Sequence, residues 1–350
     1  MARAFTDLAE LLDHGFDDVI DVRSPAEFVE DHIPGAINLP ALDNAQRAEV
    51  GTIYKQVSPF DARRIGAAMV ARNVADHVDG PLKGKDGGWR PLVYCWRGGQ
   101  RSNSVATILR QIGWRAEVVE GGYQSFRRLV NRALYDSPLP HRLILLDGNT
   151  GTAKTAVLEE LAARDVQVVD LEGLAGHRGS LLGATEAGQP EQKGFETALA
   201  AAFHRLDPGR PVVVEAESSK IGRLSLPPSL WAAMQAAPRI VIEAPLEARA
   251  AFLTGAYADI IAEPAEVARR LAPLRRLRGH EVVDRWIALL EAGEHEALAA
   301  ALMVDHYDAA YARSRRIDSR EVMATVEAAR LDAAGRAALA ERVAELVSGR

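Results

Sequence analysis

Short apolar runs alternate with helix-forming segments over most of the chain. Apolar residues between 105 and 112 recur at i, i+3, i+4 and i+7, which is the spacing of an amphipathic helix. Ser24 and Pro25 are typical of the N-cap and the first position of another helix. Strands are predicted near residues 18–23, 36–39, 92–94, 116–119, 142–147, 166–169, 211–218 and 239–243. Strands that alternate with helices predict an α/β fold.

Two changes in this pattern divide the chain. A proline-rich stretch at 137–140 ends the first set of strands and helices. From about residue 263 the strand pattern stops, and Ala, Leu, Arg and Glu dominate, as is typical of helices. We therefore predict an N-terminal domain at 1–138, a parallel-sheet domain at 139–262 and a helical C-terminal extension at 263–350.

Composition narrows the class of protein. The chain has 350 residues, 48% of them hydrophobic and 26% charged, which is ordinary for two or three globular domains. No apolar stretch approaches the roughly 18 residues of a membrane span, and acidic residues interrupt the apolar N-terminus, unlike a signal peptide. One cysteine excludes an internal disulfide, so we expect a cytoplasmic protein without a membrane partner. A net charge of −6 means that nucleic-acid binding requires local basic patches.

The single cysteine, Cys95, lies between a predicted strand and a predicted helix. A lone cysteine at a strand end is usually a small buried hydrophobe. Here, however, the N-terminus of a helix and the charges of Arg97 and Arg101 favour a nucleophilic thiolate. We predict these three residues to be catalytic. The predicted anion-binding loop beside them consists of Gly98, Gly99, Gln100 and Ser102.

The second domain opens with a pattern close to the P-loop, G-x4-G-K-[ST], directly after a strand and before a helix. Backbone N–H groups of such a loop surround a diphosphate, Lys154 contacts its oxygens, and Thr155 holds a magnesium ion if one is present. Ala153 replaces the second glycine of the pattern. The predicted diphosphate site consists of Gly148, Asn149, Thr150, Gly151, Thr152, Ala153, Lys154 and Thr155.

Polar residues follow two further strands of this domain. Ligands of α/β proteins bind at the carboxyl ends of strands. The strand at 211–218 occupies the place of a Walker B strand, so Glu215 or Glu217 is a candidate to bind magnesium directly or through water, and we favour Glu217 with Thr155. The predicted substrate- or metal-linked residues are Asp170, Glu172, His177, Arg178, Ser180, Glu217 and Ser218.

Arginines cluster in two places. Such clusters are usually solvated helix faces paired with nearby carboxylates, but they also contact RNA phosphates. The candidate tRNA-binding residues are Arg127, Arg128, Arg275, Arg276 and Arg278.

The N-terminal domain resembles a rhodanese. The resemblance rests on Asp21-Val22-Arg23, Glu27-Phe28 and His32-Ile33-Pro34-Gly35-Ala36-Ile37-Asn38, followed at a distance by the cysteine loop. Rhodaneses are α/β sulfurtransferases with a persulfide on the loop cysteine. Their usual spacing is Cys-x4-Arg, whereas Cys95 and Arg101 have the Cys-x5-Arg spacing of phosphatase and arsenate-reductase relatives. The wider loop predicts a phosphate-bearing donor beside Cys95, and we assign His32 a structural role.

Residues 1–315 as a whole resemble the tRNA 2-selenouridine synthase family. The motifs that carry this resemblance are Tyr54-Lys55-Gln56, the cysteine loop, Glu120-Gly121-Gly122-Tyr123, the run from Asp170 to Ser180, Glu217-Ser218 with Ile221-Gly222, and Tyr307-Asp308 with Tyr311. That family converts wobble 2-thiouridine in the tRNA anticodon loop to 2-selenouridine with selenophosphate. It also forms S-geranyl-2-thiouridine from geranyl diphosphate. The family usually has glycine where Ala153 stands.

The resemblance implies a division of labour between two sites. The P-loop would bind the diphosphate of geranyl diphosphate, with Lys154 and magnesium stabilising the departing pyrophosphate. The loop of Cys95 would receive or direct selenium from selenophosphate. No tightly bound cofactor is expected, and the co-substrates are selenophosphate and geranyl diphosphate.

Two alternatives fit the same residues. One is a sulfurtransferase fused to an ATP-dependent small-molecule kinase, which predicts ATP turnover and no prenyl transfer. The other is a non-catalytic adaptor that binds tRNA or nucleotide, which predicts binding unaffected by Cys95→Ser. Product analysis of 2-thiouridine tRNA separates all three.

Overall fold

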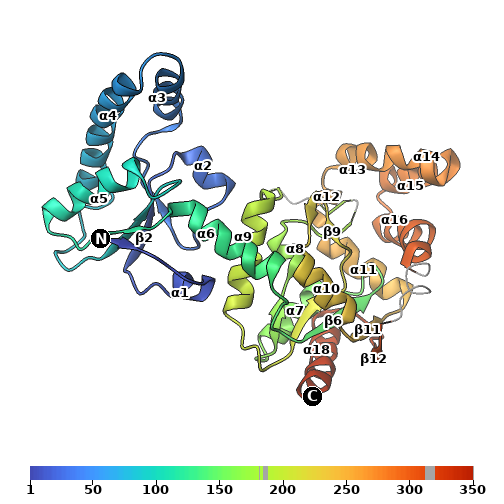
Figure 1. Ribbon diagram of the computed structural model, residues 1–350. Coiled ribbons are helices and arrows are strands. Elements are labelled where there is room, and N and C mark those ends of the chain that lie inside the picture. The colour runs from blue at the N-terminus through green and yellow to red at the C-terminus, as the bar shows by residue number, and fades with distance from the viewer. Residues whose placement is uncertain (181, 184–187, 312–319, 350) are drawn as a thin grey trace. The chain divides into compact units, whose positions relative to one another are not determined.

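The computed structural model describes residues 1–180, 182–183, 188–311 and 320–349 (Figure 1). The chain divides into two compact units. Unit 1 contains residues 1–137 and 190–204, and unit 2 contains residues 138–189 and 205–350. Helix α9 (Gln192–His204), which lies within the predicted parallel-sheet domain, thus packs in unit 1. Among the described residues, none of the helices has the length and apolar character needed to cross a membrane.

Unit 1 is built on a five-stranded parallel sheet in the order β1-β5-β4-β2-β3. Its strands are β1 (Ala2–Arg3), β2 (Asp18–Asp21), β3 (Ile37–Asn38), β4 (Pro91–Tyr94) and β5 (Glu117–Val119). Its helices are α1 (Leu8–Leu12), α2 (Pro25–Glu30), α3 (Asn44–Gln56), α4 (Pro59–Asp79), α5 (Gln100–Ile112), α6 (Gly122–Asn131), η1 (Arg132–Asp136) and α9 (Gln192–His204).

Alternate residues of the central strands of unit 1 enter two separate cores. Ile20 and Val93 belong to one buried cluster, and Val19 and Leu92 belong to the other. This alternation follows from the twofold side-chain period of a strand, and both faces are apolar because helices cover both. Cys95 directly follows β4 and belongs to the first cluster. Its thiol therefore lies at the carboxyl end of β4, just before the loop that leads into α5.

Unit 2 has a second five-stranded parallel sheet, in the order β12-β11-β6-β8-β7. Its strands are β6 (Leu143–Gly148), β7 (Gln167–Val169), β8 (Val212–Glu215), β11 (Arg239–Glu243) and β12 (Val322–Glu327), with a separate antiparallel pair, β9 (Lys220–Ile221) and β10 (Leu224–Ser225). Its helices are α7 (Lys154–Ala162), α8 (Leu171–Leu174), α10 (Pro228–Ala236), α11 (Leu246–Ala256), α12 (Ala258–Ile261), α13 (Pro264–Leu271), η2 (Ala272–Leu274), α14 (Arg275–Arg278), α15 (His280–Glu291), α16 (His295–Leu302), η3 (Met303–Tyr307) and α18 (Ala333–Ser348).

The C-terminal region is helical from Pro264 to Tyr307, as predicted. The prediction of helix without strand to the end of the chain is wrong at β12, which pairs in parallel with β11 at the sheet edge. Val326 of β12 and residues of α18 belong to the same buried cluster as the strands of the P-loop sheet. The last segment of the chain therefore completes the parallel sheet instead of extending beyond it.

Candidate functional site

The cysteine loop lies between β4 and α5, where the sequence predicted it. Gly98 has φ = 65°, and a side chain there would come within 2.6 Å of the Val119 carbonyl oxygen. Glycine is therefore required for the loop to pack against the end of β5. No side chain caps the N-terminus of α5 at Gly99. The first backbone N–H groups of this helix are consequently suited to bind an anion beside Cys95.

The thiol of Cys95 is buried and lies 3.2 Å from Ser102 Oγ. Burial alone raises the pKa of the thiol. Hydrogen bonds from the Ser102 hydroxyl and from the Ser102 and Arg97 backbone, together with the charge of Arg101, outweigh burial, so the pKa falls below its ordinary value. The structure thus supplies the electrostatic conditions expected of a reactive thiol.

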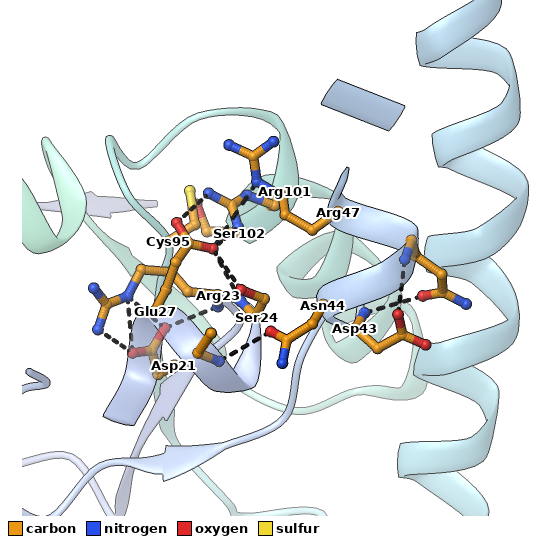
Figure 2. Close-up of polar contacts among 12 residues, drawn as sticks. Asp21, Arg23, Ser24, Glu27, Asp43, Asn44, Arg47, Cys95, Arg101 and Ser102 are labelled. Carbon is orange, nitrogen blue, oxygen red and sulfur yellow. Dashed lines mark hydrogen bonds and ion pairs between the residues drawn. The ribbon is translucent and has the colours of Figure 1, made fainter. Parts of the chain in front are cut away.

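The two arginines of the loop have different surroundings. The Arg97 side chain is exposed. The Arg101 guanidinium donates to both carboxylate oxygens of Glu27, at 2.8 and 3.3 Å (Figure 2). Burial raises the pKa of Glu27, but the hydrogen bonds and charge of Arg101 outweigh it and lower the pKa to about 2.

Glu27 was quoted from the sequence only as part of the rhodanese-like motif, and was not predicted to be a site residue. It accepts hydrogen bonds from the backbone and hydroxyl of Ser24 in the capping box at the start of α2. The spacing of Ser24 and Glu27 was the available signal, but it predicts only a helix start. His32, assigned a structural role, stacks on Phe28, and its Nδ1 lies 2.9 Å from the Phe28 carbonyl oxygen.

The P-loop follows β6 and precedes α7. Ala153 adopts a left-handed conformation with φ = 61° and ψ = 29°, and no side chain caps α7. Glycine normally fills such a position, because a left-handed residue with a side chain costs about 1 kcal/mol or more. The backbone nevertheless has the turn that the motif needs. The Lys154 ammonium donates to the Gly148 carbonyl at 3.0 Å.

A cavity of about 540 Å³ opens beside this loop within unit 2. Residues 150–156 of the P-loop form one wall, and Tyr257 and Tyr307 contribute to another. The predicted residues that line the cavity are Thr150, Gly151, Thr152, Ala153, Lys154, Thr155, Glu172, His177, Arg178, Ser180 and Glu217. Gly148 is the last residue of β6. Asn149 begins the loop, and its carbonyl oxygen accepts a hydrogen bond from the Thr152 hydroxyl in the same wall.

Two carboxylates meet in the cavity. Thr155 donates to Glu172 Oε2 at 3.2 Å, and a side chain at Gly179 would contact both Glu172 and Glu217. Burial and the neighbouring charge of Glu217 raise the pKa of Glu172 to about 8. A divalent cation would relieve this repulsion. A threonine hydroxyl and carboxylates beside a diphosphate site therefore fit magnesium, although the described residues contain no group of three or more metal-ligating side chains.

Of the other residues predicted for this unit, some line the cavity and some do not. Arg178 lines the cavity and forms two hydrogen bonds with Asp259 at 2.8 and 3.1 Å, while Ser180 Oγ lies 2.9 Å from the Tyr257 hydroxyl. Asp170 instead caps α8 by accepting from Gly173 N, and exposed Ser218 donates to the Lys220 carbonyl in its own turn. Neither of these two is among the residues that line the cavity.

An apolar pocket adjoins the P-loop cavity. The two share Thr150, Ser180, Leu253, Tyr257 and Tyr307 as lining residues. The apolar pocket is also lined by Leu182, Ile260, Ile261, Val267, Leu298, Leu302 and Met303. Helix periodicity predicts only that such residues are core, so this pocket was not expected from the sequence.

The five arginines proposed to bind tRNA are not equivalent. Arg127 is largely buried in unit 1 and pairs with Glu196 of α9. In unit 2, Arg275 pairs with Asp284 at 2.7 Å, and Arg278 donates to the His306 carbonyl at 2.9 Å. The side chains of Arg128 and Arg276 are exposed.

Comparison with known proteins gives consistent matches. The rhodanese-like domain model matches residues 4–129, and a model described as the tRNA 2-selenouridine synthase AAA domain matches residues 141–272. A tRNA 2-selenouridine synthase of Cupriavidus pinatubonensis is 35% identical over 328 residues, which cover 84% of this chain and 87% of that protein.

Two further relatives match over shorter segments. Proteins of the same name from Shewanella halifaxensis and Chromohalobacter salexigens are each 36% identical to this chain, over 68% and 69% of its length. The chain spans 65% and 66% of the length of these two relatives, slightly less than two thirds.

Proposed function

Because this chain belongs to the tRNA 2-selenouridine synthase family, we propose that it is a tRNA-modifying transferase that converts wobble 2-thiouridine to 2-selenouridine. The proposed reaction has two steps. The sulfur of 2-thiouridine first attacks C1 of geranyl diphosphate, which forms a C–S bond and releases pyrophosphate. Selenium then attacks C2 of the S-geranyl nucleoside and expels geranyl thiol.

We assign the first step to the P-loop cavity. The N-terminus of α7 and Lys154 bind the diphosphate, and Arg178 adds a positive charge to the same cavity. Magnesium held by Thr155 and Glu217 would neutralise part of the charge of the departing pyrophosphate.

The observation that carries this assignment is the apolar pocket beside the P-loop. Leu, Ile, Val and Met side chains suit a hydrocarbon chain, whereas the ribose and base of ATP lose hydrogen bonds to water in such surroundings. The pocket, of about 70 Å³, holds only one end of a geranyl chain, and the rest would lie in the adjoining cavity; this arrangement favours a prenyl diphosphate over ATP as the ligand.

We assign the second step to the loop of Cys95. The N-terminus of α5 and Arg97 hold the phosphate of selenophosphate, so that its selenium faces C2 of the modified uridine. The Cys95 thiolate attacks the phosphorus and releases selenide, which attacks C2 and expels geranyl thiol; water then cleaves the S–P bond on Cys95 and releases phosphate. A second cysteine is not required, which agrees with the single cysteine of the chain.

The test follows both products by mass spectrometry of nucleosides after incubation with 2-thiouridine tRNA, geranyl diphosphate and selenophosphate. We expect Lys154→Ala to lose geranylation and to recover selenation when the tRNA is supplied already geranylated. Cys95→Ser is expected to fold and to accumulate the S-geranyl product without selenation. ATP turnover without either modified uridine would support the kinase alternative and contradict this proposal.

A further inference from the structure

The helical hairpin formed by α3 and α4 has exposed apolar side chains at its tip. Tyr54, Val57 and Phe60 are 56%, 74% and 70% exposed, within seven residues of sequence. Figure 1 shows the turn between the two helices at the end of the hairpin farther from the sheet of unit 1. Clustered apolar side chains on a surface usually mark a binding site.

The hairpin itself is firmly built, so these side chains are not exposed through poor packing. Ser58 caps α4 and Pro59 follows at its first position. Gly66 of α4 faces the side chain of Val50 in α3, and Asn73 Nδ2 donates to Gln46 Oε1 at 2.7 Å. The tip is therefore held in place by contacts along the length of the pair.

The other end of α3 lies beside the cysteine loop. Asn44 Oδ1 accepts from the backbone N–H of Ala26 in α2, at 3.0 Å. Arg47 lies 4.0 Å from the same Glu27 carboxylate that binds Arg101 (Figure 2). A helix of 13 residues is about 20 Å long. A chain-like ligand that contacts the tip and follows α3 would thus reach the Cys95 site.

The positive charge around the tip of the hairpin indicates the chemistry of that ligand. Residues 47–64 hold four cations against two carboxylates, in a chain whose net charge is −6. Lys55 follows Tyr54 in α3, Arg63 comes one helical turn after Phe60 in α4, and both cations are exposed. Aromatic rings interleaved with cations bind unpaired nucleotides, because bases stack on the rings and phosphates contact the cations.

We propose that the α3–α4 hairpin is an RNA-binding arm, in which Tyr54 and Phe60 stack on unpaired bases and Lys55 and Arg63 contact phosphates. The arm directs the anticodon loop of the tRNA along α3 to Arg47 and the Cys95 loop. This inference rests on the proposed function, since it takes tRNA as the substrate. It adds a binding surface distinct from the five arginines considered above.

The experiment measures the affinity of the full-length protein for a 2-thiouridine anticodon stem-loop by fluorescence anisotropy. We expect Tyr54→Ala/Phe60→Ala to weaken binding at least tenfold, because each stacked base contributes about 1–3 kcal/mol. Val29→Ala/Ile112→Ala, which removes exposed apolar side chains elsewhere in unit 1, is expected to bind like the wild type. Tyr54→Phe, which keeps the ring, is also expected to retain affinity.

Phosphate contact has a separate readout. Lys55→Ala/Arg63→Ala is expected to reduce the slope of log affinity against log salt concentration, because fewer counterions are released on binding. Arg72→Ala, an exposed arginine farther along α4, is the matched control and should leave the slope unchanged.

The outcomes separate this inference from the proposed function. If the wild type modifies tRNA and both hairpin variants bind RNA normally, the hairpin is not an RNA-binding arm and the proposed function stands. If the wild type neither binds nor modifies tRNA, both fail. If sedimentation shows that Tyr54→Ala/Phe60→Ala abolishes self-association while RNA affinity is unchanged, the tip contacts a second copy of the chain and the RNA assignment is overturned.

Discussion

At the scale of single residues, the ionisation of Cys95 depends on the side chain at the third position of α5. The Ser102 hydroxyl lies 3.2 Å from the sulfur, in a hydrogen bond that either group can donate, and the Ser102 backbone N–H also lowers the pKa of the thiol; only the hydroxyl is removable by substitution. A thiolate in this position is stabilised by the same helix N-terminus that would bind the phosphate of a donor.

Ser102→Ala is expected to raise the pKa of the Cys95 thiol, because burial is then opposed by fewer hydrogen bonds. The ultraviolet absorbance of the thiolate measures this as a function of pH, with Cys95→Ser as the baseline for tyrosine absorbance. Ser104→Ala, on the same helix but exposed, should leave the midpoint unchanged. An unchanged midpoint in Ser102→Ala would show that the Ser102 hydroxyl does not contribute to lowering the pKa of the thiol.

Substitution of Ala153 measures the free-energy cost of a left-handed residue with a side chain in the P-loop. Ala153→Gly removes a left-handed alanine that costs about 1–2 kcal/mol, but glycine gains entropy in the unfolded chain, worth roughly 0.5–1 kcal/mol. We expect the free energy of unfolding to rise by up to about 1 kcal/mol, measured by urea denaturation. Ala156→Gly, in the interior of α7, should lower it by about 1 kcal/mol. A loss of stability in both variants would contradict the argument from strain.

At the scale of elements, α9 attaches to unit 1 through a buried polar cluster. Glu196 pairs with Arg127 and accepts a hydrogen bond from the Tyr135 hydroxyl at 2.6 Å. Burial and the Glu196 carboxylate raise the pKa of Tyr135 to about 12. Lys193 of the same helix forms an ion pair with Glu30, but both side chains are exposed.

Glu196→Ala is expected to destabilise the protein by roughly 3 kcal/mol, because the buried charge of Arg127 then has the more distant carboxylate of Asp31, at 3.8 Å, and neutral hydrogen-bond acceptors in place of an adjacent carboxylate. Lys193→Ala should cost less than about 1 kcal/mol, since exposed ion pairs contribute little. Urea denaturation of the two variants gives the comparison. Equal effects would mean that the buried cluster contributes no more than a surface pair.

Short sequence patterns correctly predicted those elements whose structure is determined by residues close to one another in the sequence. The strand, glycine-rich loop and helix around Cys95 and around Lys154 were predicted because each is one continuous motif. β12 was missed although Val322-Met323-Ala324-Thr325-Val326 is largely apolar, because this short edge strand lies among Ala-, Arg- and Glu-rich segments that are typical of helices. Glu27 was missed because its partner Arg101 is 74 residues away, and a single sequence does not reveal such a pairing.

At the scale of the whole molecule, each unit contributes one candidate anion site, at the carboxyl end of a central strand where a helix begins. In both, an uncapped helix N-terminus and a basic side chain follow a glycine-containing loop. Ligands for the two sites therefore differ in what surrounds the phosphate: a thiol in unit 1, and an apolar pocket with paired carboxylates in unit 2.

Pyrophosphate with magnesium is expected to slow amide hydrogen exchange in residues 150–156 and 172–180, because these segments line the cavity of unit 2. Exchange in the loop at 95–102 should not change. Lys154→Ala should remove the protection, whereas Cys95→Ser should keep it. Protection confined to the cysteine loop would indicate that pyrophosphate binds in unit 1, which would contradict the assignment of the diphosphate site to unit 2.

The placement of α9 also bears on the order in which the molecule is made. A ribosome adds residues from the N-terminus, and domains generally fold as they emerge. Unit 1, however, includes α9, which is encoded after β6, α7 and β7 of unit 2. When α9 emerges from the ribosome, β8, β11 and β12 have yet to emerge, so the rhodanese-like unit acquires its last helix while the second sheet still lacks three of its strands. The two units are thus completed in overlapping order during translation.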